Sequence, residues 1–291
     1  MHQKLLSCDQ WRAAGRSFLH RGHQVFYRDS GGDKPALLLI HGFPTASWDF
    51  YRVWDVLAQH YRLLAPDLIG FGFSDKPRDY VYSLVDQAAL CASLCARQGL
   101  TSVQLLAHDY GVSVAQELIA QHEEGSALRL RSVVFLNGGL FPESHRPRLI
   151  QKLLLSPLGP VLSRLMNEQS FRRSFSAIFG PETQPDEAEL KSFWQLITHR
   201  GGNRIMHKLI RYMRDRRVHR ARWVAAMQHT QVPMRLINGP VDPVSGAHLV
   251  ARYRELIANA DTVSLPGIGH YPQVEAPEQV LQAFFEFQAR I

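Results

Sequence analysis

Short apolar runs alternate with segments of helical spacing along much of the chain. The runs have the continuous apolar character of buried parallel strands, and the segments between them repeat apolar residues every three or four positions, as amphipathic helices do. The predicted strands are Ala36–Ile40, Tyr61–Ala65, Val103–Ala107, Leu130–Leu136, Met234–Asn238 and Thr262–Leu265. The predicted helices are Trp48–His60, Ser83–Gln98, Tyr110–His122, Ala247–Ile257 and one that begins at Pro277. This alternation predicts an α/β fold with a mostly parallel central sheet and helices on both faces.

Two segments depart from this alternation. Ser17–Arg28 consists of two short alternating stretches separated by Arg21-Gly22, which predicts an antiparallel hairpin at a sheet edge. Residues 140–228 keep helical spacing but contain no strand-like run, and proline residues and a Gly-Gly pair interrupt them. We therefore expect a helical cap at 140–228, inserted into a core formed by 1–139 and 229–291.

The strand Val103–Ala107 ends abruptly in His108-Asp109-Tyr110-Gly111. A nucleophile on a strand-to-helix turn needs small residues two positions before and after it, and Ala107 and Gly111 fill these places. The N-terminus of the following helix would keep the Asp109 carboxylate ionised, and the ionised form is the nucleophile. The alternative is that Asp109 only caps the helix.

Other polar residues also follow apolar strands directly. Asp242 stands in the turn after Met234–Asn238, and His270 stands in the turn after Thr262–Leu265. Taken singly, each could be a turn or capping residue. In a parallel sheet, however, the strand ends share one edge, and the order nucleophile, acid, base is the order of the triad in α/β-hydrolases. We expect Asp109, Asp242 and His270 to meet there.

The first apolar strand runs into His41-Gly42-Phe43-Pro44. Glycine allows an unusual turn and proline stiffens it, so the Phe43 N–H could point into a cavity as an oxyanion donor. His41 and His108 adjoin the site in sequence, and we expect both to form loop hydrogen bonds rather than to act in catalysis.

With these motifs, the chain resembles α/β-hydrolases of the epoxide hydrolase and haloalkane dehalogenase branch. Its likeness to one member of the family extends almost end to end, through HGFPTASWDF, GFGFSDKPRDY, NGGLFPESHRP and HYPQVEAP. The resemblance implies that Asp109 attacks a saturated carbon to give an enzyme ester. His270, oriented by Asp242, would then activate water, and the N–H groups of Phe43 and Tyr110 would stabilise the oxyanion. It implies no metal and no organic cofactor.

The resemblance does not settle the leaving group. Dehalogenases of this kind hold halide with a Trp after the nucleophile and an Asn in the oxyanion loop, where this chain has Tyr110 and Phe43. Epoxide hydrolases protonate the epoxide oxygen with cap tyrosines, usually two, and only Tyr212 is available in this cap. We therefore expect epoxide-hydrolase-like chemistry on a small apolar substrate and water. The alternatives are haloalkane or haloacid dehalogenation on the same triad, or a non-catalytic protein that binds a ligand in the same fold. Trp48, Phe141 and Trp194, with Phe43, are guesses for the pocket lining.

Composition limits the protein class. The 291 residues are 45% hydrophobic, which is ample for a packed core. No apolar run approaches the ~20 residues of a membrane helix, and the N-terminal stretch MHQKLLSCDQWRAAGRS lacks the apolar core of a signal peptide. We expect a soluble cytoplasmic chain with no integral membrane segment. The three cysteines lack the spacing of a zinc site or a disulfide framework.

The formal charge is +7, and the excess is concentrated between Arg200 and Arg222, which hold nine Lys or Arg residues and one acid, Asp215. This segment is interpreted as a solvated helical face, with contact to an anionic surface as the alternative. No nucleic-acid motif accompanies the charge, so we expect no nucleic-acid partner. The sequence makes no prediction about oligomeric state.

Overall fold

The computed structural model of the chain describes residues 6–291, so the first five residues of the N-terminal stretch lie outside the described part. One eight-stranded sheet forms its centre, in the order β1-β2-β4-β3-β5-β6-β7-β8. The β1–β2 and β2–β4 pairs are antiparallel, and all other pairs are parallel. The strands are β1 (Arg16–His20), β2 (His23–Asp29), β3 (Ala36–Ile40), β4 (Arg62–Pro66), β5 (Ser102–Ala107), β6 (Arg129–Phe135), β7 (Met234–Asn238) and β8 (Asp261–Ser264). The predicted α/β fold and edge hairpin are confirmed.

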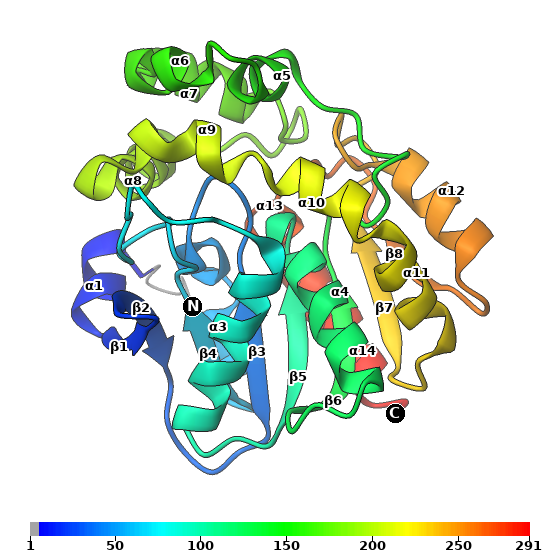
Figure 1. The fold of residues 1–291 in the computed structure, drawn as a ribbon. Helices are drawn as coiled ribbons and strands as arrows, with labels where there is room; N and C mark the ends of the chain where they lie inside the picture. Colours follow the sequence, from blue (N-terminus) through cyan, green and yellow to red (C-terminus); the bar gives the residue numbers. More distant parts are fainter. Residues whose placement is uncertain (1–5) are drawn as a thin grey trace.

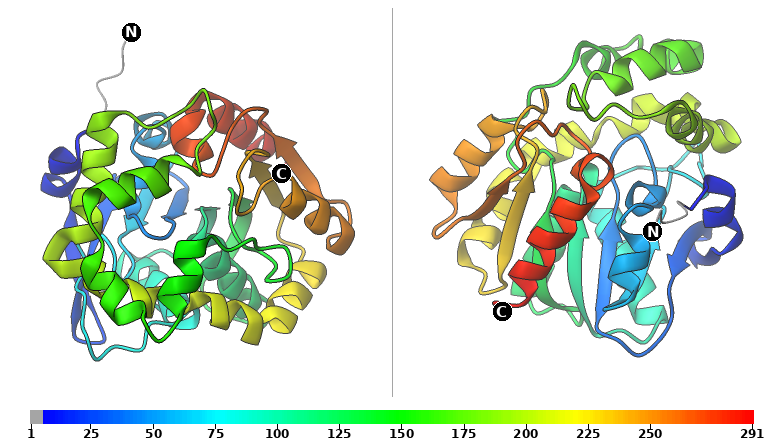
Figure 2. Two further views of the ribbon diagram at one scale, coloured as in Figure 1. Left: turned by 90° about the horizontal axis from the view of Figure 1, so that it is seen from above. Right: turned by 180° about the vertical axis from the view of Figure 1, so that it is seen from behind.

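The inner strands are apolar because helices cover both faces of the sheet. All five residues of β3 are buried, and so are the last three of β5. Figure 1 shows α3 and α4 in front of the sheet, and the view from behind in Figure 2 shows α14 on the other face. The helices outside the β6–β7 connection are α1 (Cys8–Ala13), η1 (Ser47–Phe50), α2 (Trp54–Ala58), α3 (Leu84–Arg97), α4 (Tyr110–Glu123), α12 (Ala247–Leu256), α13 (Pro272–Glu275) and α14 (Pro277–Gln288).

The connection from β6 to β7 contains helices and loops. In Figure 1 its first helices lie above the carboxyl ends of the strands, whereas its last helix, α11, runs beside α4. The helices are α5 (Leu149–Leu155), α6 (Gly159–Leu165), α7 (Glu168–Ser176), α8 (Glu187–Thr198), η2 (His199–Ile205), α9 (Met206–Leu209), α10 (Tyr212–Val218) and α11 (Arg220–His229). Within residues 6–291, none of the helices combines the length and apolar character needed to cross a bilayer.

Candidate active site

Asp109 lies on a sharp turn between β5 and α4. Its φ of 43° and ψ of −101° put a residue with a side chain in a sparsely populated backbone region, at a cost of about 1–3 kcal/mol. The turn is packed tightly, since a Cβ on Gly111 would lie 2.3 Å from the carbonyl oxygen of Ile40. Asp109 precedes α4, but its side chain accepts no hydrogen bond from the first turn of that helix. The capping interpretation of Asp109 is therefore wrong.

The Asp109 carboxylate is buried, with 3% of the residue exposed, and is surrounded by donors and positive charge. The Phe43 N–H donates to its Oδ2 at 3.0 Å. Its Oδ1 lies 3.9 Å from His270 Nε2 and 3.7 Å from Arg216 Nη2. Burial acts to raise the pKa of Asp109, but the charges of His270 and Arg216 outweigh it and lower the pKa. The carboxylate is thus ionised at neutral pH.

Asp242 and His270 form a buried pair, in which His270 Nδ1–H donates to Asp242 Oδ2 at 2.7 Å. The same oxygen accepts bonds from Ser245 Oγ at 2.6 Å and Asn137 Nδ2 at 2.9 Å. Burial opposes charge on both partners, but their mutual attraction lowers the pKa of Asp242 and raises the pKa of His270 to about 9. The structure thus brings together the three residues that strand order predicts to meet.

Sequence reasoning missed Arg216, which it counted as part of a solvated basic face. The side chain of Arg216 is 2% exposed. Its Nη2 donates to the Asp109 carbonyl oxygen at 3.0 Å, and its Nε donates to Ser113 Oγ at 2.7 Å. Its guanidinium also lies 4.5 Å from the centre of the Tyr212 ring. The spacing of Tyr212 and Arg216, four residues apart on one helix face, is the signal that could have linked them.

Sequence reasoning also missed His145, in the loop between β6 and α5. Within residues 6–291, neither ring nitrogen of His145 has a hydrogen-bond partner. Burial and the nearby Arg216 lower the pKa of His145 to about 3, so its ring is neutral. A Cβ on Gly139 would lie 2.3 Å from Arg216 Nη1 and 3.2 Å from His145 Nδ1, which places both side chains beside this glycine. Nothing in the local sequence of His145 distinguishes it from an ordinary loop histidine.

A cavity of about 590 Å³ opens onto Asp109, His270 and Phe43. Its remaining wall is mainly apolar, and much of it comes from α5, α6 and α7, with Leu149, Leu153, Leu154, Leu162, Leu165 and Phe171 among the lining residues. The cavity therefore suits an apolar ligand that reaches the carboxylate.

Three of the guesses for the lining are wrong, because Trp48, Phe141 and Trp194 pack elsewhere. Trp48 stacks on Tyr51, with ring centres 4.2 Å apart, and Phe141 is fully buried near Tyr253. Trp194 packs against Phe171, with ring centres 5.5 Å apart. Trp194 therefore contacts a residue of the cavity wall without lining the cavity itself.

Tyr212 and Tyr110 lie next to the site without lining this cavity. The Tyr212 ring contacts Phe43 and Tyr110, with ring centres 5.7 and 5.1 Å away. Gln151 Nε2, from the cavity wall, donates to Tyr212 Oη at 3.5 Å. Burial raises the pKa of Tyr212, so the phenol keeps its proton at neutral pH. Tyr110 is the first residue of α4, immediately after Asp109.

His41 and His108 form the loop hydrogen bonds expected of them. His41 Nδ1–H donates to the Gly42 carbonyl oxygen at 2.8 Å, and His41 Nε2 accepts from the Leu68 N–H at 3.0 Å. His108 Nε2–H donates to the His270 carbonyl oxygen at 2.8 Å. Among residues 6–291, no group of three or more His, Cys, Asp or Glu side chains is placed to hold a metal ion.

The class of protein is an α/β-hydrolase, as defined by the order of the strands, the strained turn at Asp109 and the buried Asp242–His270 pair. The chain belongs to the alpha/beta hydrolase family, whose pattern matches residues 37–283. It is 41% identical over 290 residues to the mesoderm-specific transcript protein (MEST) of Mus musculus, covering 95% of this chain and 86% of that protein. It is also 41% identical over 278 residues to the putative hydrolase LipZ of Mycobacterium tuberculosis, covering 95% and 96% of the two chains.

Solved structures share the fold at low identity. The epoxide hydrolase CorEH superimposes with a TM-score of 0.77 at 18% identity, covering 95% of this chain and 98% of that chain. A mutant haloalkane dehalogenase, DatA, from Agrobacterium tumefaciens gives a TM-score of 0.79 at 20% identity, covering 94% and 96%. At such identities, the likeness shows a common fold.

Proposed function

We propose that this α/β-hydrolase opens an epoxide with Asp109 and hydrolyses the resulting ester with His270. The observation that carries the proposal is an ionised carboxylate on a strained turn that lines a mainly apolar cavity, with a histidine nitrogen 3.9 Å away. A serine in that place would favour acyl transfer, whereas a carboxylate suits displacement at a saturated carbon. In this proposal residues 140–228 act as the cap that supplies the apolar wall.

In the first half-reaction, an Asp109 oxygen bonds to an epoxide carbon and the carbon–oxygen bond of the ring breaks. The released alkoxide needs a proton or a positive charge. Tyr212 is proposed as the proton donor, since its phenol is protonated and its ring touches Phe43. The Arg216 guanidinium supplies positive charge beside the reacting carboxylate.

In the second half-reaction, the gap between His270 Nε2 and Asp109 Oδ1 has a function. At 3.9 Å it is too long for a hydrogen bond, so Nε2 is available to a water molecule. Conversion of Asp109 into an ester removes a negative charge that helps to raise the pKa of His270. The histidine then loses its proton more readily and can act as the base, with the N–H groups of Phe43 and Tyr110 as oxyanion donors.

Dehalogenation of a haloalkane or haloacid is the second candidate, and Arg216 favours it. A buried guanidinium 3.7 Å from the nucleophile could hold a halide, or the carboxylate of a haloacid, in the absence of the Trp and Asn donors of dehalogenases. In both cases the small-molecule substrate is apolar at its reacting carbon, and no cofactor takes part.

The test is the intact mass of a His270→Gln variant after incubation with a panel of epoxides and alkyl halides. Attack by Asp109 should proceed while hydrolysis stops, which leaves a covalent adduct on Asp109. Its mass separates epoxide opening, in which the whole reagent is retained, from halide loss. Asp109→Asn is the matched control and should remain unlabelled. A folded His270→Gln protein without an adduct across the panel would contradict the proposal and favour a non-catalytic binder.

A further inference from the structure

The nine cations between Arg200 and Arg222 do not form one surface. Arg216 lies in the active site, as described above. Arg220 pairs with Glu143, and Arg222 pairs with Glu117 and Glu124, so carboxylates balance the end of the segment. The beginning of the segment is different, because Arg200, Arg204 and Lys208 line a second cavity. Neither a uniform solvated face nor the proposed hydrolase accounts for this cavity.

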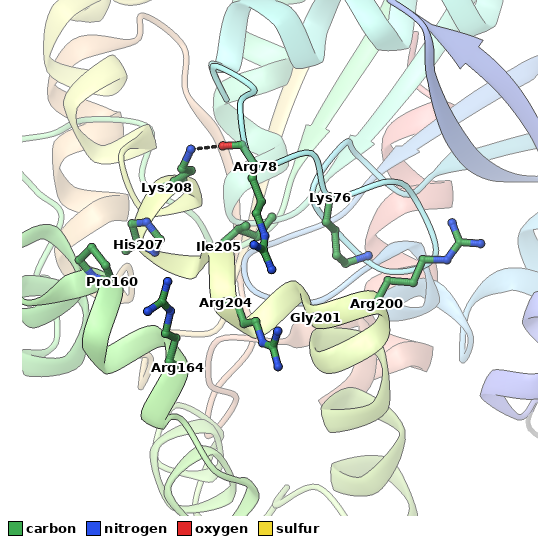
Figure 3. A pocket seen from close by; sticks show the side chains of 10 residues that line it. All are labelled: Lys76, Arg78, Pro160, Arg164, Arg200, Gly201, Arg204, Ile205, His207 and Lys208. Carbon is green, nitrogen blue, oxygen red and sulfur yellow. Dashed lines mark hydrogen bonds between the residues drawn. The ribbon is translucent and has the colours of Figure 1, made fainter.

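The second cavity measures about 450 Å³, and six cationic side chains from three separate segments line it (Figure 3). The loop after β4 contributes two of them, α6 one, and η2 with α9 the rest. They are Lys76, Arg78, Arg164, Arg200, Arg204 and Lys208. His207 also lines the cavity, and none of the described residues in its wall is acidic.

Contacts made by the lining residues themselves hold the three segments of this cavity together. The Lys208 ammonium donates to the carbonyl oxygen of Arg78, the bond drawn in Figure 3, and Arg200 pairs with Asp75 at 3.1 Å. The Ser163 hydroxyl accepts the His207 N–H at 3.0 Å and ties α6 to α9. The three segments are therefore joined without any anion in the cavity.

Some of the cations are used by this frame, and others are not. Lys76 Nζ donates to the carbonyl oxygens of Gly72 at 2.6 Å and Ser74 at 2.8 Å. Burial lowers the pKa of Lys76 to about 8. By contrast, the guanidinium groups of Arg78, Arg164 and Arg204 form no ion pair with any described residue. All three of these arginines are exposed, so water and salt screen their mutual repulsion, and an anion bound among them would be favoured most at low ionic strength.

We propose that this cavity is a binding site for a phosphate-bearing anion with at least two negative charges. Guanidinium groups bind phosphate oxygens through paired N–H donors, and three such groups from separate segments can surround a diphosphate. The cavity is larger than a single phosphate requires, which favours a ligand with more than one phosphate or with an organic part.

The phosphate could belong to a free small molecule or to a lipid headgroup. Exposed apolar side chains on α6, and at the residue before it, make the second source testable. Leu158, Val161 and Leu165 are 61%, 54% and 68% exposed. The first arm measures binding of inorganic pyrophosphate by calorimetry at low ionic strength. The second measures co-sedimentation with phosphatidylcholine vesicles, with and without phosphatidate.

The test variant is Arg164→Gln with Arg204→Gln. The matched control is Arg214→Gln with Arg217→Gln, which removes the same charge from exposed arginines of the same basic segment outside the cavity. We expect the test variant to bind at least tenfold more weakly in whichever arm the wild type binds, and the control to bind normally. Circular dichroism verifies the fold of both variants.

Pyrophosphate binding without vesicle binding identifies a free phosphate ligand. Phosphatidate-dependent vesicle binding that pyrophosphate competes away identifies a headgroup. Absence of binding in both arms, or equal weakening in test and control variants, overturns the proposal. Since neither readout depends on turnover, a failure here is separate from a failure of the hydrolase proposal.

Discussion

The buried Asp242–His270 pair should make stability depend on pH in a way that one substitution removes. Asp242→Asn keeps the shape of the side chain but removes the charge bonded to His270 Nδ1 at 2.7 Å. In the folded chain, burial lowers the pKa of His270, whereas the carboxylates of Asp242 and Asp109 raise it. The net result is a pKa of about 9, against an ordinary value of 6.5. At 1.36 kcal/mol for each pH unit, this difference corresponds to about 3 kcal/mol of folding free energy.

The sign follows from the raised pKa. Protonation of His270 stabilises the folded state fully below pH 6.5, and this contribution is lost as the pH rises through about 9. The wild type should therefore lose about 3 kcal/mol from this group between pH 6 and pH 10. In Asp242→Asn the stronger of the two raising charges is gone, while burial and the weaker effect of Asp109 remain and oppose each other, so the corresponding loss should be much smaller than in the wild type. The substitution should be more destabilising at pH 6 than at pH 10 by most of those ~3 kcal/mol.

Urea unfolding of both proteins at the two pH values measures this difference, and all other titrating groups cancel in the comparison. His270→Gln provides the control, because in its background Asp242→Asn should cost the same at pH 6 and pH 10. If Asp242→Asn destabilises the wild-type protein equally at both pH values, Asp242 is not coupled to a protonated His270. That result would also refute the assignment of this pair as acid and base.

Three further predictions concern the site. Arg216→Met should lower kcat by a factor of about 10²–10³ and move the acid limb of the kcat/KM profile to higher pH, because a positive charge that lowers the pKa of Asp109 is lost. An unchanged pH profile would exclude Arg216 as a group that keeps Asp109 ionised. Tyr212→Phe should lower kcat on an epoxide more than on an alkyl halide, since only the epoxide oxygen needs a proton; equal losses in steady-state assays would remove Tyr212 as the donor. Gly111→Ala should lower the free energy of unfolding by more than the ~1–2 kcal/mol expected for Gly125→Ala. A Cβ would lie 2.3 Å from the Ile40 carbonyl oxygen in the first variant, whereas nothing lies within 4 Å of it in the second. The midpoints of urea unfolding compare the two variants.

Much of the fold could be predicted because its signals are local. A strand buried on both faces must be apolar throughout, and β3 and β5 are recognisable on that ground alone. The helix after Asp109 begins and ends within two residues of the predicted bounds, since helical spacing is a property of neighbouring residues. The contact between Asp242 and His270 could also be predicted, because parallel strands bring their carboxyl ends to one edge of the sheet.

The surroundings of Asp109 could not be predicted in the same way. Whether Arg216 points to solvent or toward Asp109 depends on how α10 packs against α4, and no local pattern encodes that rotation. The same reason applies to His145, which is half-buried and lies near Arg216 only because the β6–α5 loop places it beside Gly139. It also applies to Trp194, whose ring packs against Phe171 but does not line the cavity.

The sequence by itself determined the layered sheet, the turn that bears Asp109 and the order of the candidate triad, since each can be predicted from short local patterns at separate strands. Only the tertiary structure decided which cations meet Asp109, which pair with carboxylates and which surround a second cavity. An arginine has the same local signature in all three places, and its role depends on which distant segments the fold brings within a few ångströms of its guanidinium.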